Sequence, residues 1–161
     1  MEKDIACLSC ADRTIRIFDL QDFQPGLVIK CDKRQSQAYP TAICINEIQL
    51  VAGFSNGDLI IYDVENGDEL LKIAQADRVC VTSVSAIKTQ ICVGGLEGDV
   101  RVWDLRSQHI VTQLKPHQGR VTKVKFVKDQ DGKLVCFSAG DDRYFVATCN
   151  GAHIFDCQLS G

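Results

Sequence analysis

The side chains that could bind a metal or act as nucleophiles in this chain are nine cysteines and three histidines. Cys7 and Cys10 form a C-x-x-C pair, but residues three apart in an extended run point to opposite faces. No second C-x-x-C or C-x-x-H follows at zinc spacing. Most other cysteines stand in apolar, strand-like stretches such as Ile91–Val93 and Val135–Phe137. We therefore expect nine reduced thiols and no metal, in a reducing compartment such as the cytosol or nucleus.

No catalytic set is visible among the other polar residues. None of the histidines, His109, His117 and His153, stands at a readable spacing from a nucleophile and an orienting carboxylate. The run Gly94–Gly98 has the composition of a phosphate loop, but a strand-like segment follows it instead of a helix. The sequence therefore favours a protein that is not an enzyme and carries no cofactor.

The stretch from Lys115 to Lys128 concentrates basic charge. Lys123 and Lys125 alternate along an expected strand and so share one face. The stretch is either a site for phosphate or an acidic peptide, or ordinary solvated charge, and no aromatic residues interleave with it for base stacking. In the whole chain, 18 basic and 21 acidic residues give a net charge of −3, which makes nucleic acid an unlikely partner.

Length and composition are those of one globular domain. The 161 residues are 45 % apolar and 24 % charged. No apolar run approaches the roughly 18–20 residues of a membrane span, and the charged start Met1–Asp4 lacks a signal-peptide core. We expect a protein of the cytoplasm or nucleus without membrane contact.

Short β-branched runs separated by turn residues dominate the chain, and helix signals are almost absent. Pairs such as Asn56-Gly57 and Gly98-Asp99 stand between two apolar runs and indicate tight hairpins. The expected hairpins are Ile5–Cys10 with Ile15–Leu20, Leu50–Ser55 with Leu59–Val64, and Ile91–Leu96 with Val100–Leu105.

The hairpins repeat one unit. Each ends in an aromatic-Asp pair, and the pairs are Phe18-Asp19, Tyr62-Asp63 and Trp103-Asp104, 44 and 41 residues apart. A fourth copy at regular spacing spans Leu134–Cys149, with Thr148 at the aromatic position. The alternative places the fourth pair at Phe155-Asp156, 52 residues after Trp103-Asp104. We favour the regular spacing, because a period in the low forties is typical of stacked propeller blades.

The segment His117–Phe126 matches the pattern His-x-x-x-Val-x-x-Val-x-Phe. With the three aromatic-Asp pairs in register, the chain resembles the WD40-repeat family over nearly its whole length. The resemblance implies an all-β fold of about four blades, each a four-stranded antiparallel sheet, in one domain of residues 1–161. The implied blades are about 5–31, 41–75, 81–115 and 121–157, with inner strands at Thr41–Ile45, Val81–Ile87 and Val121–Val127 and outer strands at Leu27–Cys31, Leu70–Gln75, His109–Lys115 and Ala152–Cys157.

The family links a His, a Ser or Thr, an Asp and the Trp of a blade by buried hydrogen bonds. The fourth copy keeps His117, Ser138 and Asp142 of this set, so the resemblance gives these residues, with Trp103 and Asp104, structural roles. The first three copies have Leu8, Ala52 and Val93 where Ser138 stands. We expect apolar packing to replace the polar network there.

The repeats also predict an incomplete propeller. The residues before Ile5 are too few for the inner strand of the first blade, and propellers of this family usually close with about seven blades. We therefore expect a fragment of a longer propeller or one completed by another chain. We also expect the isolated chain to self-associate or to depend on a partner.

Partners of WD40 proteins often bind the face that carries the d–a and b–c loops. The resemblance places Arg78, His117 and Arg120 on this face from one loop class, and Asp12, Asp58, Asp99, Asp141 and Arg143 from the other, where they could equally be ordinary turn formers. Trp103–Arg106 resembles the W-D-x-R motif by which propeller receptors of cullin-type ubiquitin ligases dock an adaptor through the Arg. The implied function is a protein-protein interaction scaffold in a multiprotein complex. The alternatives are a ligase receptor acting through Arg106 and a nucleic-acid-associated propeller using Lys115–Lys128.

Overall fold

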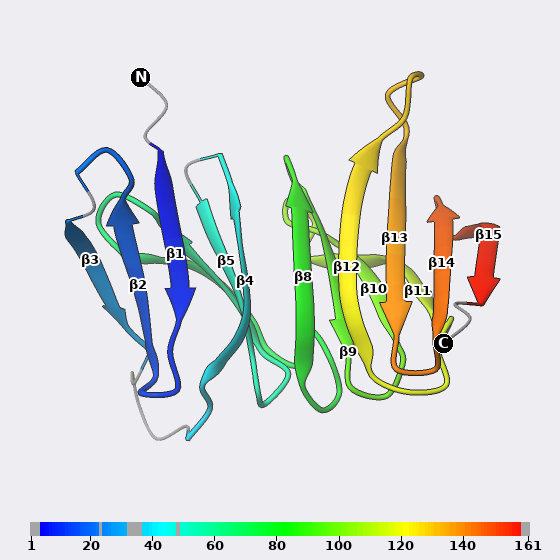
Figure 1. Cartoon of the computed structure of the whole chain (residues 1–161), viewed down its shortest axis with the longest axis horizontal. Coiled ribbons are helices and arrows are strands. Elements are labelled where there is room, and N and C mark those ends of the chain that lie inside the picture. The colour runs from blue at the N-terminus through cyan, green and yellow to red at the C-terminus, as the bar shows by residue number, and fades with distance from the viewer. Residues whose placement is uncertain (1–3, 23, 32–36, 48, 159–161) are drawn as a thin grey trace.

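The computed structural model of the chain describes residues 4–22, 24–31, 37–47 and 49–158. In this part the chain forms four antiparallel sheets that stand side by side like blades, with blade 1 at one end of the row and blade 4 at the other (Figure 1). Three sheets have four strands and the first has three. Among these residues there is no helix with the length and apolar character needed to cross a bilayer.

The strands follow the chain from the inner to the outer edge of each blade. Blade 1 consists of β1 (Ile5–Ser9), β2 (Thr14–Asp19) and β3 (Pro25–Lys30). Blade 2 consists of β4 (Pro40–Asn46), β5 (Gln49–Phe54), β6 (Leu59–Asp63) and β7 (Glu69–Ile73). Blade 3 consists of β8 (Val81–Ile87), β9 (Gln90–Gly95), β10 (Val100–Asp104) and β11 (His109–Leu114). Blade 4 consists of β12 (Val121–Lys128), β13 (Leu134–Gly140), β14 (Tyr144–Cys149) and β15 (Ala152–Gln158).

A bulge marks the same point in every blade and confirms the regular spacing of the repeats. The pairing between the two outermost strands shifts register at Phe18, Tyr62, Trp103 and Thr148. Thr148 is therefore the counterpart of the aromatic residues, as the spacing predicts. Phe155 and Asp156 lie in the outer strand β15 instead.

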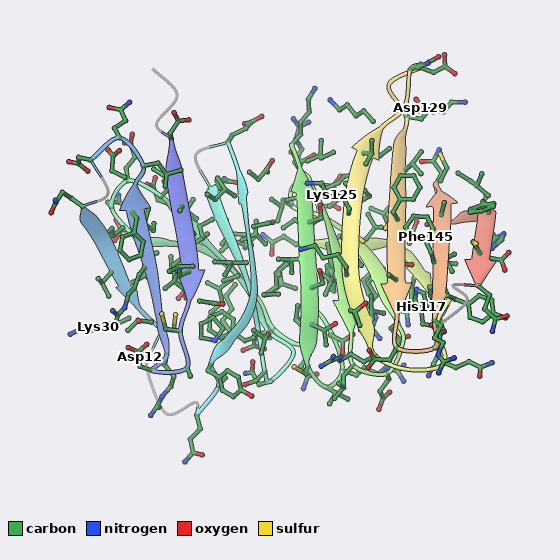
Figure 2. The ribbon with its side chains drawn as sticks, in the orientation of Figure 1. Asp12, Lys30, His117, Lys125, Asp129 and Phe145 are labelled. Atoms are coloured by element: carbon green, nitrogen blue, oxygen red, sulfur yellow. The ribbon has the colours of Figure 1, made fainter. Side chains whose placement is uncertain are left out.

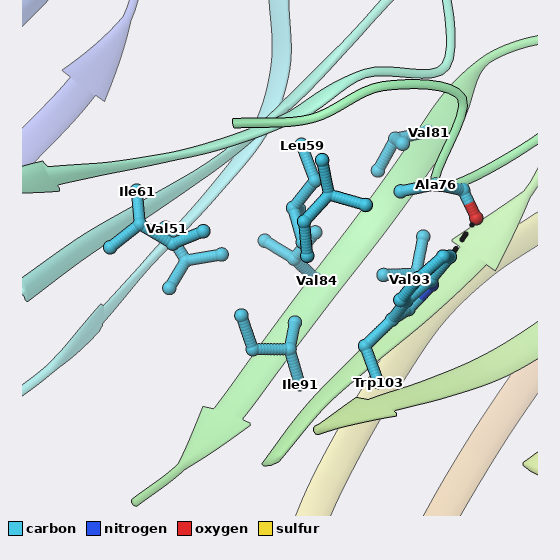
Figure 3. Packing of buried hydrophobic residues seen from close by; sticks show 10 residues of the cluster. Val51, Leu59, Ile61, Ala76, Val81, Val84, Ile91, Val93 and Trp103 are labelled. Atoms are coloured by element: carbon cyan, nitrogen blue, oxygen red, sulfur yellow. Dashed lines mark hydrogen bonds between the residues drawn. The ribbon is translucent and has the colours of Figure 1, made fainter. Parts of the chain in front are cut away.

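The core lies between the blades, because each sheet buries side chains on both faces. In β5, Leu50 and Ala52 pack toward blade 1, whereas Val51 between them packs toward blade 3. Such strands read as continuous apolar runs, since successive side chains alternate between two covered faces. The central cluster between blades 2 and 3 contains Leu59 and Ile61 of β6, Trp103 of β10, and Ala76 of the loop before β8 (Figure 3). A third cluster, around Cys92, Val100 and Phe126, joins blades 3 and 4.

A threonine at the second position of the inner strands β4 and β8 joins each of these blades to the next by hydrogen bonds. The hydroxyl of Thr41 bonds to the carbonyl of Gly53 in its own blade at 3.0 Å and to that of Val81 in the next blade at 2.5 Å. Thr82 repeats this with Gly94 at 2.9 Å and Val121 at 2.5 Å. The hydroxyl of each threonine therefore fixes how far the next inner strand is shifted along the strand direction.

Two serines of β8 add a second set of bonds between blades 3 and 4. The hydroxyl oxygen of Ser83 accepts the backbone N–H of Val124 at 3.1 Å, and that of Ser85 accepts the N–H of Phe126 at 3.0 Å. These N–H groups point away from their own sheet. The serines thus satisfy polar groups that would otherwise be buried without a partner.

The aspartate of each aromatic-Asp pair closes the turn after its strand. The carboxylate of Asp104 accepts the backbone N–H of Arg106 at 2.7 Å and that of Ser107 at 3.3 Å. Asp63 does the same for Glu65 at 2.7 Å. This Asx-type turn explains why an aspartate follows the aromatic residue in the first three repeats.

The two ends of the row carry open faces within the described residues. In blade 1, β1 has β2 as its single strand neighbour, and Leu8 is 54 % exposed. In blade 4, the stacked rings of Phe137 and Phe145, with centroids 5.4 Å apart, occupy the positions that Cys92 and Val100 fill in the covered face of blade 3.

We predict that Thr82→Val lowers the free energy of unfolding by about 1–3 kcal/mol, because the carbonyls of Gly94 and Val121 lose the hydroxyl proton that they share. Thr122→Val is the matched control, since Thr122 is exposed and its hydroxyl bonds to the carbonyl of Ala139 in its own blade. Denaturant titration of both variants gives the comparison. Equal losses would show that the bond between blades contributes little.

Trp103→Ala should lower the free energy of unfolding by roughly 3–5 kcal/mol, the usual cost of removing a large buried aromatic side chain. Trp103 is 9 % exposed, and its indole N–H donates to the carbonyl of Ala76 at 3.4 Å. The change therefore opens a cavity between blades 2 and 3. A melting temperature within a degree of the parent would contradict this account of the core.

All nine cysteines stand as free thiols, and those of Cys92 and Cys136 approach to 3.0 Å across the interface of blades 3 and 4. Burial, reinforced by the Cys136 thiol, raises the pKa of Cys92 well above its ordinary value. We predict that Cys92 reacts with thiol reagents far more slowly in the folded chain than Cys157, which is exposed. The denatured protein should titrate as nine thiols without reductant, and the folded protein should carry no zinc. A count of seven free thiols would reveal one disulfide.

Candidate functional site

A hydrogen-bonded chain of three side chains ties two loops together at one end of blade 4. The Nε2 atom of His117 lies 2.9 Å from the hydroxyl of Ser138, and its Nδ1 atom lies 3.0 Å from a carboxylate oxygen of Asp142. The second oxygen of that carboxylate accepts the N–H of Gln118 at 2.9 Å. With Asp142 ionised, Nδ1 donates and Nε2 accepts the serine proton. His117 is 1 % exposed, so the arrangement anchors the loop that leads to Arg120.

Blade 3 uses a buried ion pair at the same place. Asp77 occupies the position of His117 in the repeat, and its carboxylate lies 2.6 Å from the guanidinium of Arg101. The guanidinium also reaches the carboxylate of Asp99 at 3.6 Å, and all three residues are buried. The expectation that apolar packing replaces the polar network was therefore wrong for blade 3. Val93 does replace the serine, but a charged pair takes over the link between the loops.

A glycine makes room for the polar group in both blades. A Cβ atom on Gly140 would lie 2.6 Å from Nδ1 of His117, and one on Gly95 would lie 2.2 Å from a carboxylate oxygen of Asp77. Any larger residue would push the loop outward. In blades 3 and 4, β9 and β13 therefore end in a glycine that leaves room for Asp77 or His117, the polar residue of the loop before the inner strand.

These anchored loops surround a funnel where the inner strands begin. The funnel has a volume of about 530 Å³ and takes residues from all four blades. Its lining comprises Ser9, Cys10, Ala11, Tyr39, Pro40, Thr41, Cys80, Val81, Thr82, Leu96, Arg120, Val121 and Thr122. Asp12 and His117 mark this end of the row, opposite Asp129 (Figure 2).

The wall of the funnel is mostly apolar, with one cation. Tyr39 is 48 % exposed and Leu96 is 42 % exposed. Arg120 is the single charged side chain of the lining, and its guanidinium lies 3.3 Å from the carboxylate of Asp141. Both partners are about half exposed, so water screens this pair and leaves the arginine available to a ligand. Burial raises the pKa of the Cys80 thiol, which therefore stays protonated at neutral pH.

Sequence reasoning missed the aromatic and thiol parts of this wall. Tyr39, Cys80 and Arg120 each stand one residue before an inner strand, so they are the same position in three repeats. Arg120 entered the predicted site because of its charge, while Tyr39 and Cys80 did not. Aligning the repeats at the start of the inner strand would have brought all three together.

The other predicted residues spread over the molecule. Arg78, Asp141 and Arg143 are exposed on the funnel end but outside its lining, and Arg143 holds a positive φ of 68° at the hairpin turn. Arg106 is exposed in the turn between β10 and β11, at the opposite end of the blade. The basic stretch divides likewise, because Lys115 and Arg120 lie in the funnel-end loop and Lys128 ends β12 at the far side. It forms no single patch.

The pH dependence of the unfolding free energy tests the loop anchor formed by Asp142. Burial alone would raise the pKa of Asp142, but the N–H groups of Gln118 and Tyr144 and the His117 ring outweigh it, so the pKa is lowered. The stabilisation is therefore present above the unfolded-state pKa of about 3.9 and is lost as the pH falls through the lower folded-state value.

Asp142→Asn should accordingly make unfolding free energy fall less steeply between about pH 5 and pH 2 than in the parent. Asp142→Ala should cost about 1–3 kcal/mol at pH 7, because His117 and Gln118 lose an acceptor. Urea titrations across the pH range measure both effects. Parallel pH curves for parent and Asp142→Asn would contradict the assigned role.

Comparison with known proteins adds sequence relatives to this geometry. A scan against models of protein families found no match. The chain is 32 % identical over 91 residues to human F-box/WD repeat-containing protein 8, covering 55 % of the chain and 14 % of that protein. It is 29 % identical over 97 residues to pig cilia- and flagella-associated protein 52, covering 58 % and 15 %. It is 28 % identical over 130 residues to human protein NEDD1, covering 78 % and 19 %. The chain thus spans less than a fifth of each relative.

Solved structures share the fold at low sequence identity. A chain of the mitotic checkpoint complex superposes with a TM-score of 0.79 and 19 % identity, covering 96 % of this chain and 46 % of that one. The computationally designed Ika8 protein gives a TM-score of 0.71 and 18 % identity, covering 98 % and 60 %. With four stacked blades and the repeated aromatic-Asp turns, the chain has the fold of a partial WD40-type β-propeller, and part of its sequence is similar to WD-repeat proteins.

Proposed function

We propose that this chain is a protein-interaction scaffold that holds a segment of a partner protein in the funnel. WD-repeat relatives support an interaction role in general. The observation that carries the specific proposal is the 530 Å³ funnel, to which all four blades contribute. Loops held by buried polar contacts on rigid sheets are a typical place for recognition. No turnover is part of this function.

The wall chemistry indicates what the partner offers. Tyr and Arg are the residue types most often found at the energetic centre of protein interfaces, and both stand here. We therefore propose an apolar side chain that enters between Tyr39 and Leu96, next to a carboxylate that reaches Arg120. The site lies on the surface that the sequence predicted from Arg120 and its neighbours.

The experiment is capture of partners from cell extract, followed by mass spectrometry, with the parent chain, Arg120→Ala and Tyr39→Ala. Arg78→Ala is the matched control, since it removes an exposed arginine from the same end but outside the lining. We expect both lining variants to bind the same partner proteins about tenfold or more weakly than the parent chain, which corresponds to at least 1.4 kcal/mol of binding free energy. Retention of every partner by both lining variants would reject the funnel as the binding site.

A second candidate rests on the turn after Trp103. Arg106 is exposed there, and one of the matched relatives is an F-box/WD repeat protein. We propose as the alternative that Arg106 docks the adaptor of a cullin-type ubiquitin ligase. Arg106→Ala should then remove one adaptor from the captured set and leave the funnel partners in place. Unchanged capture would reject the alternative.

The compartment and assembly state belong to the same proposal. Nine free thiols support a reducing compartment, either cytoplasm or nucleus. The open faces of blades 1 and 4 support association with another chain. Light scattering at several concentrations checks this part, and a concentration-independent monomer with one cooperative melt would refute it.

A further inference from the structure

Two thiols meet inside the interface between blades 3 and 4. The sulfur atoms of Cys92 in β9 and Cys136 in β13 lie 3.0 Å apart, although the two residues are 44 positions apart in the chain. Cys92 is 0 % exposed and Cys136 is 4 % exposed, and both belong to the buried cluster that joins these blades. The contact therefore lies within the apolar interface, away from the residues that line the funnel.

The interface between blades 2 and 3 shows that apolar side chains can fill the same two positions. The strand registers make Val51 the counterpart of Cys92, and Ile91 the counterpart of Cys136. Val51 and Ile91 are fully buried in the central cluster. Packing alone thus does not require sulfur at this place, and what the thiol pair adds is its chemistry.

We propose that Cys92 and Cys136 are a redox modification site, at which a hydroperoxide converts the two thiols into a disulfide that joins blades 3 and 4. A disulfide bond is about 2.05 Å long, so the two sulfur atoms need to approach each other by about 1 Å. Two groups held in contact react with each other faster than with a thiol from another molecule. The inference goes beyond the proposed scaffold function and does not rest on it.

The oxidation balances in two steps. First, Cys136, the less buried thiol, gives up its proton, and its sulfur attacks one oxygen of hydrogen peroxide. The O–O bond breaks, one OH stays on the sulfur as a sulfenic acid, and the other leaves with the proton as water. The sulfur of Cys92 then attacks that of Cys136, and the sulfenic OH leaves with the Cys92 proton as a second water. The two sulfur atoms supply the two electrons that reduce the peroxide.

Burial determines both when this reaction starts and where it ends. It raises the pKa of the Cys92 thiol well above its ordinary value, so this thiol is protonated at neutral pH and the pair stays reduced until a peroxide enters. The sulfenic acid of Cys136 would place a polar group in an apolar interface. Disulfide formation expels that oxygen as water and leaves an apolar bridge. The interface therefore favours the disulfide over further oxidation.

The test is treatment of the folded 161-residue chain with hydrogen peroxide, followed by blocking of the remaining thiols in denaturant and tryptic digestion without reductant. Trypsin cuts after lysine and arginine, so Cys92 and Cys136 fall in the separate peptides 89–101 and 134–143, which contain no other cysteine. We expect these peptides to appear as one linked species, lighter than their sum by two hydrogen atoms. Reductant should separate them.

The bridge should also stabilise the folded chain, because it constrains residues that are 44 positions apart in the unfolded state. We expect oxidation to raise the melting temperature by roughly 5–15 °C. Cys92→Val keeps the packing, since Val51 fills the same position in blade 2, and should show neither the linked species nor the rise. Cys157→Ser is the matched control, because it removes an exposed thiol and should behave like the parent.

Three results would each overturn the proposal. The first is recovery of peptides 89–101 and 134–143 from the treated chain as separate thiols, or as sulfinic or sulfonic acids. The second is a linked species whose formation leaves the melting temperature unchanged or lowers it, because the disulfide would then not fit the interface. The third is an equal rise in Cys92→Val. Partner capture enters none of these readouts, so the proposed function keeps its own test.

Discussion

Face-to-face contact between neighbouring blades is the interaction on which this structure depends. A single sheet such as blade 2 carries Ala52 on one face and Val51 on the other, both fully buried, and can cover neither alone. Stability therefore resides in the interfaces between repeats, as in other repeat proteins. For the same reason, the two end faces of the row are prone to associate with other strands or sheets.

Polar contacts set the position of each blade within this apolar stack. The hydroxyls of Thr41 and Thr82 fix the inner strands in height, and the amide of Asn46 bonds to the backbone of Lys88 at the other end of the same interface. Because these bonds sit where the strands begin and end, they also determine the shape of the funnel. The scaffold and its candidate binding surface are thus products of the same contacts.

Repetition made most of the fold predictable from the sequence. The aromatic-Asp pairs located the hairpins, and their spacing placed Thr148 correctly although it is not aromatic. The loop anchor of blade 4 was visible because His117, Ser138 and Asp142 match a family pattern. The anchor of blade 3 was not, since the position of Arg101 is apolar in blades 2 and 4, where Ile60 and Val146 stand, and the Arg16 of blade 1 pairs with Asp12 at the surface. The threonine bridges escaped notice because each joins carbonyls about 12 and 40 residues away, a relation that hydrophobic periodicity does not encode.

Native-state hydrogen exchange of the isolated chain tests most directly whether the blades stabilise one another. Blade 3 is covered on both faces, so the hydrogen-bonded amides of β8 and β9 should exchange most slowly and approach the global unfolding limit. The amides of Ala6 and Leu8, bonded to β2 in the end blade, should exchange much faster. Equal protection of β1 and β8 would contradict the account, because it would mean that the end blade is stable without a neighbour on its open face.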